Sequence, residues 1–171
     1  MLIRALTEQD AEAFWALRLR SLTEHPDAFG TSPEEQAAPA DVMAARFCNE
    51  YIAPPENNFI LGAFDENGEM TGIVSLRREP RKKLRHKGTV FGVYVAPGSR
   101  QRGVARAMLQ ELIRRAKEME GLEQINLMVM SGNARAKRLY ASLGFQTYGT
   151  EKHAMKMGET YYDEDLMVLF I

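Results

Sequence analysis

Several residues that would fix a chemistry are scarce in this 171-residue chain. Cys48 is its only cysteine, so neither an intramolecular disulfide nor a cysteine-based metal cluster can form within it. The histidines His25, His86 and His153 stand singly, without the spacing of a metal-binding motif. The sequence therefore predicts a protein without a metal site.

Charge bias and long apolar runs are also missing. With 22 basic and 23 acidic residues the net charge is −1, which speaks against a protein whose whole surface binds nucleic acid or membrane. No stretch approaches the roughly 18 apolar residues of a membrane-spanning helix. Arg4, Glu8 and Asp10 interrupt any apolar run of a signal peptide. We therefore expect a cytoplasmic protein with no membrane partner, and the balanced charge disfavours a nucleic-acid partner while leaving room for a local basic patch.

What the chain does have is an ordinary globular composition, 45% hydrophobic and 26% charged. A compact chain of this length buries roughly 68–70% of its unfolded surface, which is enough for a core without cross-links. We predict a single domain over residues 1–171.

Hydrophobic periodicity predicts a mixed α/β chain. A strand and helices come first, then a meander of strands, then a strand–helix–strand–helix–strand order. A loop over residues 26–41, rich in proline and glycine, is unusually long for a compact domain, and long loops are often functional. Pro54-Pro55 ends the second predicted helix. The expected strands are 2–6, 59–64, 70–76, 89–95, 124–130, 145–148 and 166–171, and the expected helices are 8–24, 41–50, 102–120 and 133–143.

The segment from Val95 to Ala105 lies between a predicted strand and a predicted helix, and Gly103 in it costs a helix about 1 kcal/mol relative to Ala. Small residues there let backbone N–H groups approach a ligand, and a helix N-terminus attracts anions. Arg100, Arg102 and Arg106 would crowd the positive end of the helix dipole unless a polyanion such as pyrophosphate bound there. The alternative is a plain strand–helix turn with solvated arginines. The segment has neither the Gly-Lys-Ser/Thr of a P-loop nor the full glycine set of a dinucleotide fingerprint.

A second informative segment runs from Asn133 to Phe145. Asn133 is a good N-cap, and Gly144 suits the left-handed position that follows a helix. Tyr140 lies two turns after Asn133 on roughly the same side. One alternative for this tyrosine is a core aromatic whose hydroxyl reaches water. The apolar face of the helix is formed by Ala136, Leu139, Tyr140 and Leu143.

Together the two segments resemble the GNAT superfamily of N-acetyltransferases. Arg100-Gln-Arg-Gly103-Val-Ala105 is similar to the family pattern Gln/Arg-x-x-Gly-x-Gly/Ala and follows a strand that ends Val95-Ala-Pro97. Residues 133–145 match Asn-x-x-Ala-x-x-Leu-Tyr-x-x-x-Gly-Phe at every defined position. The resemblance implies a GNAT-like fold, with a central mixed, mostly antiparallel sheet that contains a splayed strand pair and is flanked by helices.

The resemblance also implies direct transfer of an acetyl group from acetyl-CoA to a primary amine of a small molecule, a polyamine or a protein N-terminus. It assigns Tyr140 as the general acid, and the reference pKa of tyrosine, about 10, keeps its proton in place at pH 7. By the same resemblance the loop holds the CoA pyrophosphate and the preceding strand holds the pantetheine arm. The implied cofactor-binding residues are Val93, Val95, Arg100, Gln101, Arg102, Gly103, Val104, Ala105 and Asn133.

The general base is not evident from the sequence. An alkylamine with a pKa near 10.4 must lose a proton before it attacks. Strand segments 90–95 and 125–130 contain no Asp, Glu or His, so we predict that proton removal does not use the central strands. A water relay is one alternative, and the side-chain candidates are Glu34, Glu35, Glu79, Asp163 and, more weakly, His86.

The basic stretch Arg77–Lys87 leaves other functions open. Its seven cations and one anion would suit a solvated connection between strands, a nucleic-acid contact or an acidic partner. The chief alternative to an enzyme is a non-catalytic acyl-CoA sensor that regulates a partner through this stretch. The presence of Tyr140 disfavours the sensor, because a pure binder has no need of a phenol there. Edge strands near the C-terminus are compatible with a homodimer.

Overall fold

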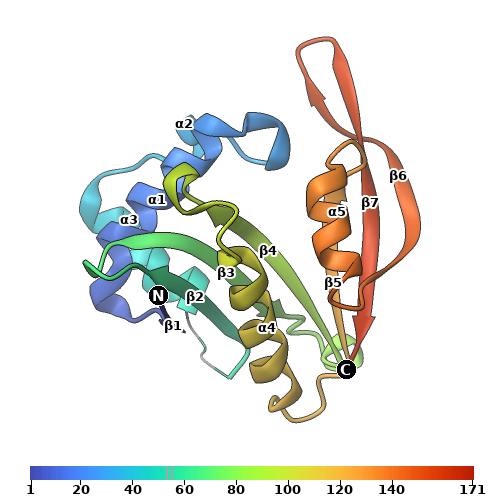
Figure 1. Ribbon diagram of the computed structural model, residues 1–171, viewed down its shortest axis with the longest axis horizontal. Helices are drawn as coiled ribbons and strands as arrows, with labels where there is room; N and C mark the ends of the chain where they lie inside the picture. Colours follow the sequence, from blue (N-terminus) through green and yellow to red (C-terminus); the bar gives the residue numbers. More distant parts are fainter. Residues whose placement is uncertain (53, 55) are drawn as a thin grey trace.

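One seven-stranded sheet organises the chain. The computed structural model describes residues 1–52, 54 and 56–171 (Figure 1), and its strand order is β1-β2-β3-β4-β5-β7-β6. Strands β4 and β5 pair in parallel, and the other neighbours pair antiparallel. The prediction of a mixed, mostly antiparallel sheet is confirmed. The strands are β1 (Leu2–Ala5), β2 (Asn58–Phe64), β3 (Met70–Arg78), β4 (Lys87–Val95), β5 (Gln124–Met130), β6 (Gln146–Met157) and β7 (Thr160–Phe170).

Helices cover both faces of this sheet. Because side chains alternate along a strand, Ile60 of β2 packs under Phe14 and Phe47 on one face, while Leu61 packs under Met108 on the other. The first face carries the N-terminal helices and the second carries α4 and α5 (Figure 1). The helices are α1 (Ala11–Glu24), α2 (Pro33–Gln36), α3 (Ala40–Arg46), α4 (Val104–Lys117) and α5 (Ala134–Ala141). In the described part of the chain no helix is long and apolar enough to cross a membrane.

The parallel pair β4/β5 opens soon after it begins. Lys87–Thr89 pair with Gln124–Asn126, and beyond these residues the two strands diverge (Figure 1). Gly92, with φ of +66°, lies where the β3–β4 register shifts, and such a shift is typical of a β-bulge. This divergence is the splayed strand pair of the predicted fold, and it opens a cleft in the middle of the sheet.

Element boundaries differ from the prediction where local hydrophobicity is a poor guide. The predicted strands 145–148 and 166–171 are the inner ends of a long hairpin, β6–β7, which turns at Gly158 with φ of +57°. Its outer residues are largely polar and exposed, so no buried face marks them as strands.

The helix ends differ by a few residues for local reasons. The predicted helix 102–120 begins at Val104, because Gly103 at φ of +77° is not helical. The predicted loop 26–41 holds the short helix α2. α3 begins one residue early and continues through a π-helical turn, Phe47–Ile52. The predicted stop at Pro55 lies outside the described residues.

Candidate functional site

The cleft between β4 and β5 encloses a cavity of about 660 Å³. Its two side walls are the diverging strand segments 89–95 and 127–130. The loop that leads into α4 closes one end, α5 lies along one wall, and residues 25–30 after α1 form a rim. Because parallel pairing is confined to residues 87–89 in the described chain, the β4 backbone beyond Thr89 is free of β5 and accessible to an extended ligand.

The loop before α4 adopts a backbone that favours an anion. Gln101 has φ of +63° and Gly103 has φ of +77°, so two residues within one turn are left-handed. A Cβ on Gly103 would meet no atom within 4 Å, and this residue lines the cavity. The N-terminus of α4 follows directly at Val104, where backbone N–H groups and the helix dipole attract negative charge. Arg102 is exposed and is not part of the cavity wall.

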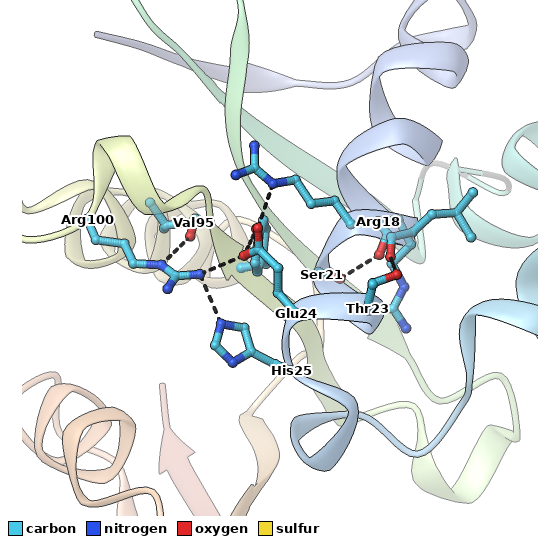
Figure 2. Close-up of polar contacts among 10 residues, drawn as sticks. Arg18, Ser21, Thr23, Glu24, His25, Val95 and Arg100 are labelled. Atoms are coloured by element: carbon cyan, nitrogen blue, oxygen red, sulfur yellow. Dashed lines mark hydrogen bonds and ion pairs between the residues drawn. The ribbon is translucent and has the colours of Figure 1, made fainter.

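The guanidinium of Arg100 is bonded to the protein rather than free. Its Nε donates to the Val95 carbonyl at 2.8 Å, and its Nη2 lies 3.3 Å from Glu24 Oε2 and 3.0 Å from His25 Nε2 (Figure 2). The hydroxyl of Tyr94 donates to the same Glu24 oxygen at 2.6 Å. An arginine is always a donor, so His25 accepts at Nε2. Arg100, a predicted cofactor-binding residue, thus ties the loop to the end of α1. The same residue also contributes to the lining of the cavity.

Helix α5 brings Asn133 and Tyr140 to the cleft wall. Asn133 Oδ1 accepts from the backbone N–H of Ala136 at 3.0 Å, so the predicted N-cap is confirmed. Tyr140 is 7% exposed, and its ring packs edge-on against Phe145 with centroids 6.0 Å apart. Burial raises the pKa of Tyr140 to about 12, so its hydroxyl keeps its proton throughout the neutral range. The ring is therefore a core aromatic and a cleft residue at once.

A buried carboxylate holds α5 in place. Asp165 of β7 forms an ion pair with Lys137 Nζ at 2.5 Å and accepts from Ser131 Oγ at 2.6 Å and from Thr150 Oγ1 at 3.0 Å. These hydrogen bonds, with Lys137 the largest cause, lower the pKa of Asp165 to about 2. One side chain thus joins α5, β6, β7 and the turn that follows β5, behind the cleft wall.

Replacing Asp165 with Asn is expected to lower the free energy of unfolding at pH 7 by about 2 kcal/mol, because Lys137 loses a charged partner. A pKa below the unfolded value means that the stabilisation is complete above about pH 4 and is lost as the pH falls toward 2. Denaturant melts of the variant should therefore lose part of the wild-type pH dependence in this window. Asp163→Asn is the matched control, since its ion pair with Lys152 lies at the surface and should contribute less to stability than the buried pair of Asp165. Equal stability losses in the two variants would contradict this role.

The base candidates taken from the sequence lie away from the cleft lining. Glu34 and Glu35 begin α2, where backbone and side-chain hydrogen bonds lower the pKa of each carboxyl. Glu79 pairs with Arg81, outside the cavity wall. Asp163 pairs with Lys152 at 2.8 Å, which lowers its pKa and makes it a weaker base. His86 precedes β4 at the closed end of the strand pair.

The acidic side chains that do line the cavity are Asp27 and Glu164. Glu164 lies on β7, opposite Met130 on one side and Glu151 on the other. Burial, and then the like charge of Glu151, raises the pKa of Glu164, which makes its carboxylate a stronger base than an ordinary glutamate. Sequence reasoning missed this residue because it lies before the predicted strand 166–171. The long β6–β7 pairing brings it to the cleft.

The basic stretch 77–87 serves partly as structure. Arg78 is buried and donates to the carbonyl oxygens of Arg85 at 2.5 Å and Glu120 at 2.8 Å. The stretch links β3 to the closed end of the strand pair rather than to the open cleft. Its use as a connection between strands is thereby supported.

Comparison with known proteins agrees with this geometry. The profile of the family described as the acetyltransferase (GNAT) domain matches residues 3–166. This chain belongs to the GNAT acetyltransferase family. The predicted family and fold are therefore confirmed, whereas the extent of the domain and the roles of individual site residues stay predictions.

Individual GNAT relatives are distant in sequence and close in fold. An L-amino acid N-acetyltransferase of Escherichia coli strain K12 is 31% identical over 94 residues, which are 54% of this chain and 57% of that protein, so the match spans little more than half its length. The crystal structure of a GNAT acetyltransferase from Streptococcus pneumoniae is 28% identical, with a TM-score of 0.87 and 99% of each chain covered. The structure of yncA, a putative acetyltransferase from Salmonella typhimurium, contains its cofactor acetyl-CoA. It is 23% identical with a TM-score of 0.84, over 99% of this chain and 93% of that one.

Proposed function

We propose that this GNAT protein transfers the acetyl group of acetyl-CoA directly to a primary amine of a small molecule, a polyamine or a protein N-terminus. The observation that carries the proposal is the cleft itself. One opening in the sheet has an anion-favouring loop at its end and the buried Tyr140 on its wall. An elongated thioester with a pyrophosphate at one end fits both features.

The residues present fit acetyl-CoA as a substrate. Gly103 leaves the space before α4 open, so the N–H groups of Val104 and Ala105 are available to a pyrophosphate. Val93 and Val95 lie on the divergent part of β4, where backbone groups that β5 does not pair are available to the amide-rich pantetheine arm, although the Val95 carbonyl already accepts from Arg100. Arg106 Nη2 donates to Ser142 Oγ at 2.7 Å, and the side chain lines the cleft between α4 and α5. Its positive charge there favours binding of the phosphate end of acetyl-CoA.

The chemistry needs an uncharged amine, a place for the oxyanion and a proton for sulfur. The amine nitrogen attacks the carbonyl carbon, the C–N bond forms, and the carbonyl oxygen carries the developing charge beside the β4 backbone. The C–S bond then breaks, and Tyr140 donates its phenolic proton to the departing thiolate. Because burial raises the pKa of this hydroxyl to about 12, the proton is present at every physiological pH.

We assign removal of the amine proton to Glu164, which lines the same cavity as Tyr140 and is not on β4 or β5. Its raised pKa means that the carboxylate forms at higher pH than an ordinary glutamate. Activity carried by this group should rise as the pH increases through that pKa, which gives the acid limb of a pH–rate profile.

Glu164→Gln is expected to lower kcat/KM by about 10- to 100-fold and to abolish that acid limb. Glu151→Gln should move the limb to lower pH, because it removes the like charge that raises the pKa. The measurement is a pH–rate profile from pH 5 to 10, with Glu159→Gln in the exposed hairpin turn as the control. An unchanged limb in the Glu164 variant would transfer the role to water or to another residue.

The proposed function is tested by incubating the protein with acetyl-CoA and a mixed panel of amines, with products read by mass spectrometry. The panel holds polyamines, amino acids, aminoglycosides and peptides with free N-termini. An acetylated product, absent with Tyr140→Phe, supports the proposal. Tight acetyl-CoA binding without any product would favour the sensor instead.

A further inference from the structure

Arg18 is a buried cation in the cleft wall that has almost no polar partners. It is 7% exposed on α1 and lines the cavity (Figure 2 shows it on the helix that ends at Glu24). Its Nε and Nη1 atoms are fully buried and have no hydrogen-bond partner among the described residues. A buried charge without compensation is costly, so an anion from outside the chain would stabilise it.

The surroundings of Arg18 hold the guanidinium in place without neutralising it. Its Cζ lies 4.8 Å from the centre of the Phe29 ring, and this cation–π contact holds the guanidinium against the ring. Burial lowers the pKa of the guanidinium, and the neighbouring Tyr51 hydroxyl partly offsets this. Asp27 lines the same cavity, and among the described residues it forms no ion pair with this arginine.

The Arg18 side chain extends from α1 to β4 beside Gly92. A Cβ built on Gly92 would lie 3.8 Å from Nη1. Gly92 lies between Thr89, where the strands part, and Val93, where the pantetheine arm is proposed to run. If the pantetheine arm runs along β4 away from the pyrophosphate loop, its thioester end reaches the part of the strand beside Arg18, so an anion held by Arg18 would lie next to the acetyl group.

We propose that Arg18 binds the carboxylate of the acceptor, so that the acceptor is an amino acid with a free carboxyl group close to the amine. This inference rests on the proposed acetyl transfer and narrows its acceptor. A carboxylate in the cavity would pair with the charge of the Arg18 guanidinium and thereby orient the nearby amine toward the thioester. A polyamine would bring only cations to this guanidinium. A protein N-terminus carries a peptide bond where the carboxylate would be.

The test compares each of the twenty L-amino acids with its own carboxamide, in the full-length protein with acetyl-CoA. The pair shares the amine and the side chain and differs in the carboxylate. For the preferred amino acid we expect the wild type to favour the carboxylate by about 50-fold in kcat/KM, because the amide leaves a buried charge unpaired. In Arg18→Met the preference should vanish because kcat/KM for the carboxylate falls to the value for the carboxamide. The acetyl-CoA Kd should stay unchanged. Arg18→Lys should restore part of it, since an ammonium keeps the charge without the fork.

A second readout separates binding from support of the fold. If Arg18 were structural, the Met variant would melt at a lower temperature than the wild type. If it serves the acceptor, the ligand-free Met variant should melt at the same or a higher temperature, because an unpaired buried charge is replaced by apolar packing. Amino acids added with CoA should raise the melting temperature of the wild type and leave that of the variant unchanged.

Equal kcat/KM for carboxylates and carboxamides in the wild type would overturn this inference and leave the acetyltransferase proposal intact. Acetylation of polyamines or peptides alone would also overturn it. If acetyl-CoA binds and no amine is acetylated, the proposed function fails. Binding of free amino acids to wild type, and not to Arg18→Met, would even then support the carboxylate site.

Discussion

Tyr140→Phe is expected to lower kcat by about 100- to 10,000-fold, the range that a positioned general acid supplies. The phenyl ring keeps the packing against Phe145, so the fold and the acetyl-CoA Kd should change little. What is lost is the proton for the departing thiolate, which then leaves as an anion in a buried site. Steady-state kinetics with the best amine from the panel, together with calorimetric titration of acetyl-CoA, measure the two effects separately.

The control for this variant is Tyr148→Phe, on β6, where the side chain is 61% exposed. It removes the same hydroxyl from the protein without touching the cleft and should leave kcat unchanged. Turnover of Tyr140→Phe equal to that of the wild type would remove this residue from catalysis. Because burial raises the pKa of Tyr140 to about 12, the wild-type rate should not decline through its ionisation below about pH 11.

Gly103→Val is expected to weaken acetyl-CoA binding by at least about 100-fold, equivalent to about 3 kcal/mol. Two effects combine. A β-branched residue at φ of +77° is strained by about 1–2 kcal/mol, which pulls the loop away from its left-handed turn. Its side chain also enters the open space in which no protein atom lies within 4 Å, and this is where the pyrophosphate would bind. Calorimetric titration with acetyl-CoA gives the change in affinity directly.

Two further variants separate strain from obstruction. Gly98→Val lies in the same loop, also in open space, at a position with no left-handed backbone, and should leave the Kd nearly unchanged. Gly103→Asn tolerates positive φ, so any remaining loss of affinity reports the side chain in the anion site. Unchanged affinity in Gly103→Val would mean that the pyrophosphate binds elsewhere.

The parts of the site that the sequence predicted are those encoded within one short segment. Gly103 before a helix, Asn133 as an N-cap and Tyr140 two turns later are all read from local spacing, and the structure places all three at the cleft. The same holds for the inner strands, because Ile60 and Leu61 alternate between two buried faces.

The parts that the sequence did not predict depend on contacts between distant segments. Glu164 reaches the cleft through pairing with Met130 and Glu151, and nothing near it in the sequence marks that position. Arg18 lies among the residues of an ordinary helix, and only the tertiary structure shows that its Nε and Nη1 atoms are buried without a partner among the described residues. The carboxylates chosen from sequence were surface residues, since exposure is not encoded in residue type.

The short ladder between β4 and β5 has a mechanical consequence. The sheet consists of two halves, β1–β4 and β5–β7–β6, and direct strand contact joins them over only three residue pairs at one end. The two halves could move relative to each other by a hinge motion about the paired residues Lys87–Thr89. A ligand bound along β4 would contact both halves at once, so its binding would stabilise their relative arrangement as well as the folded state.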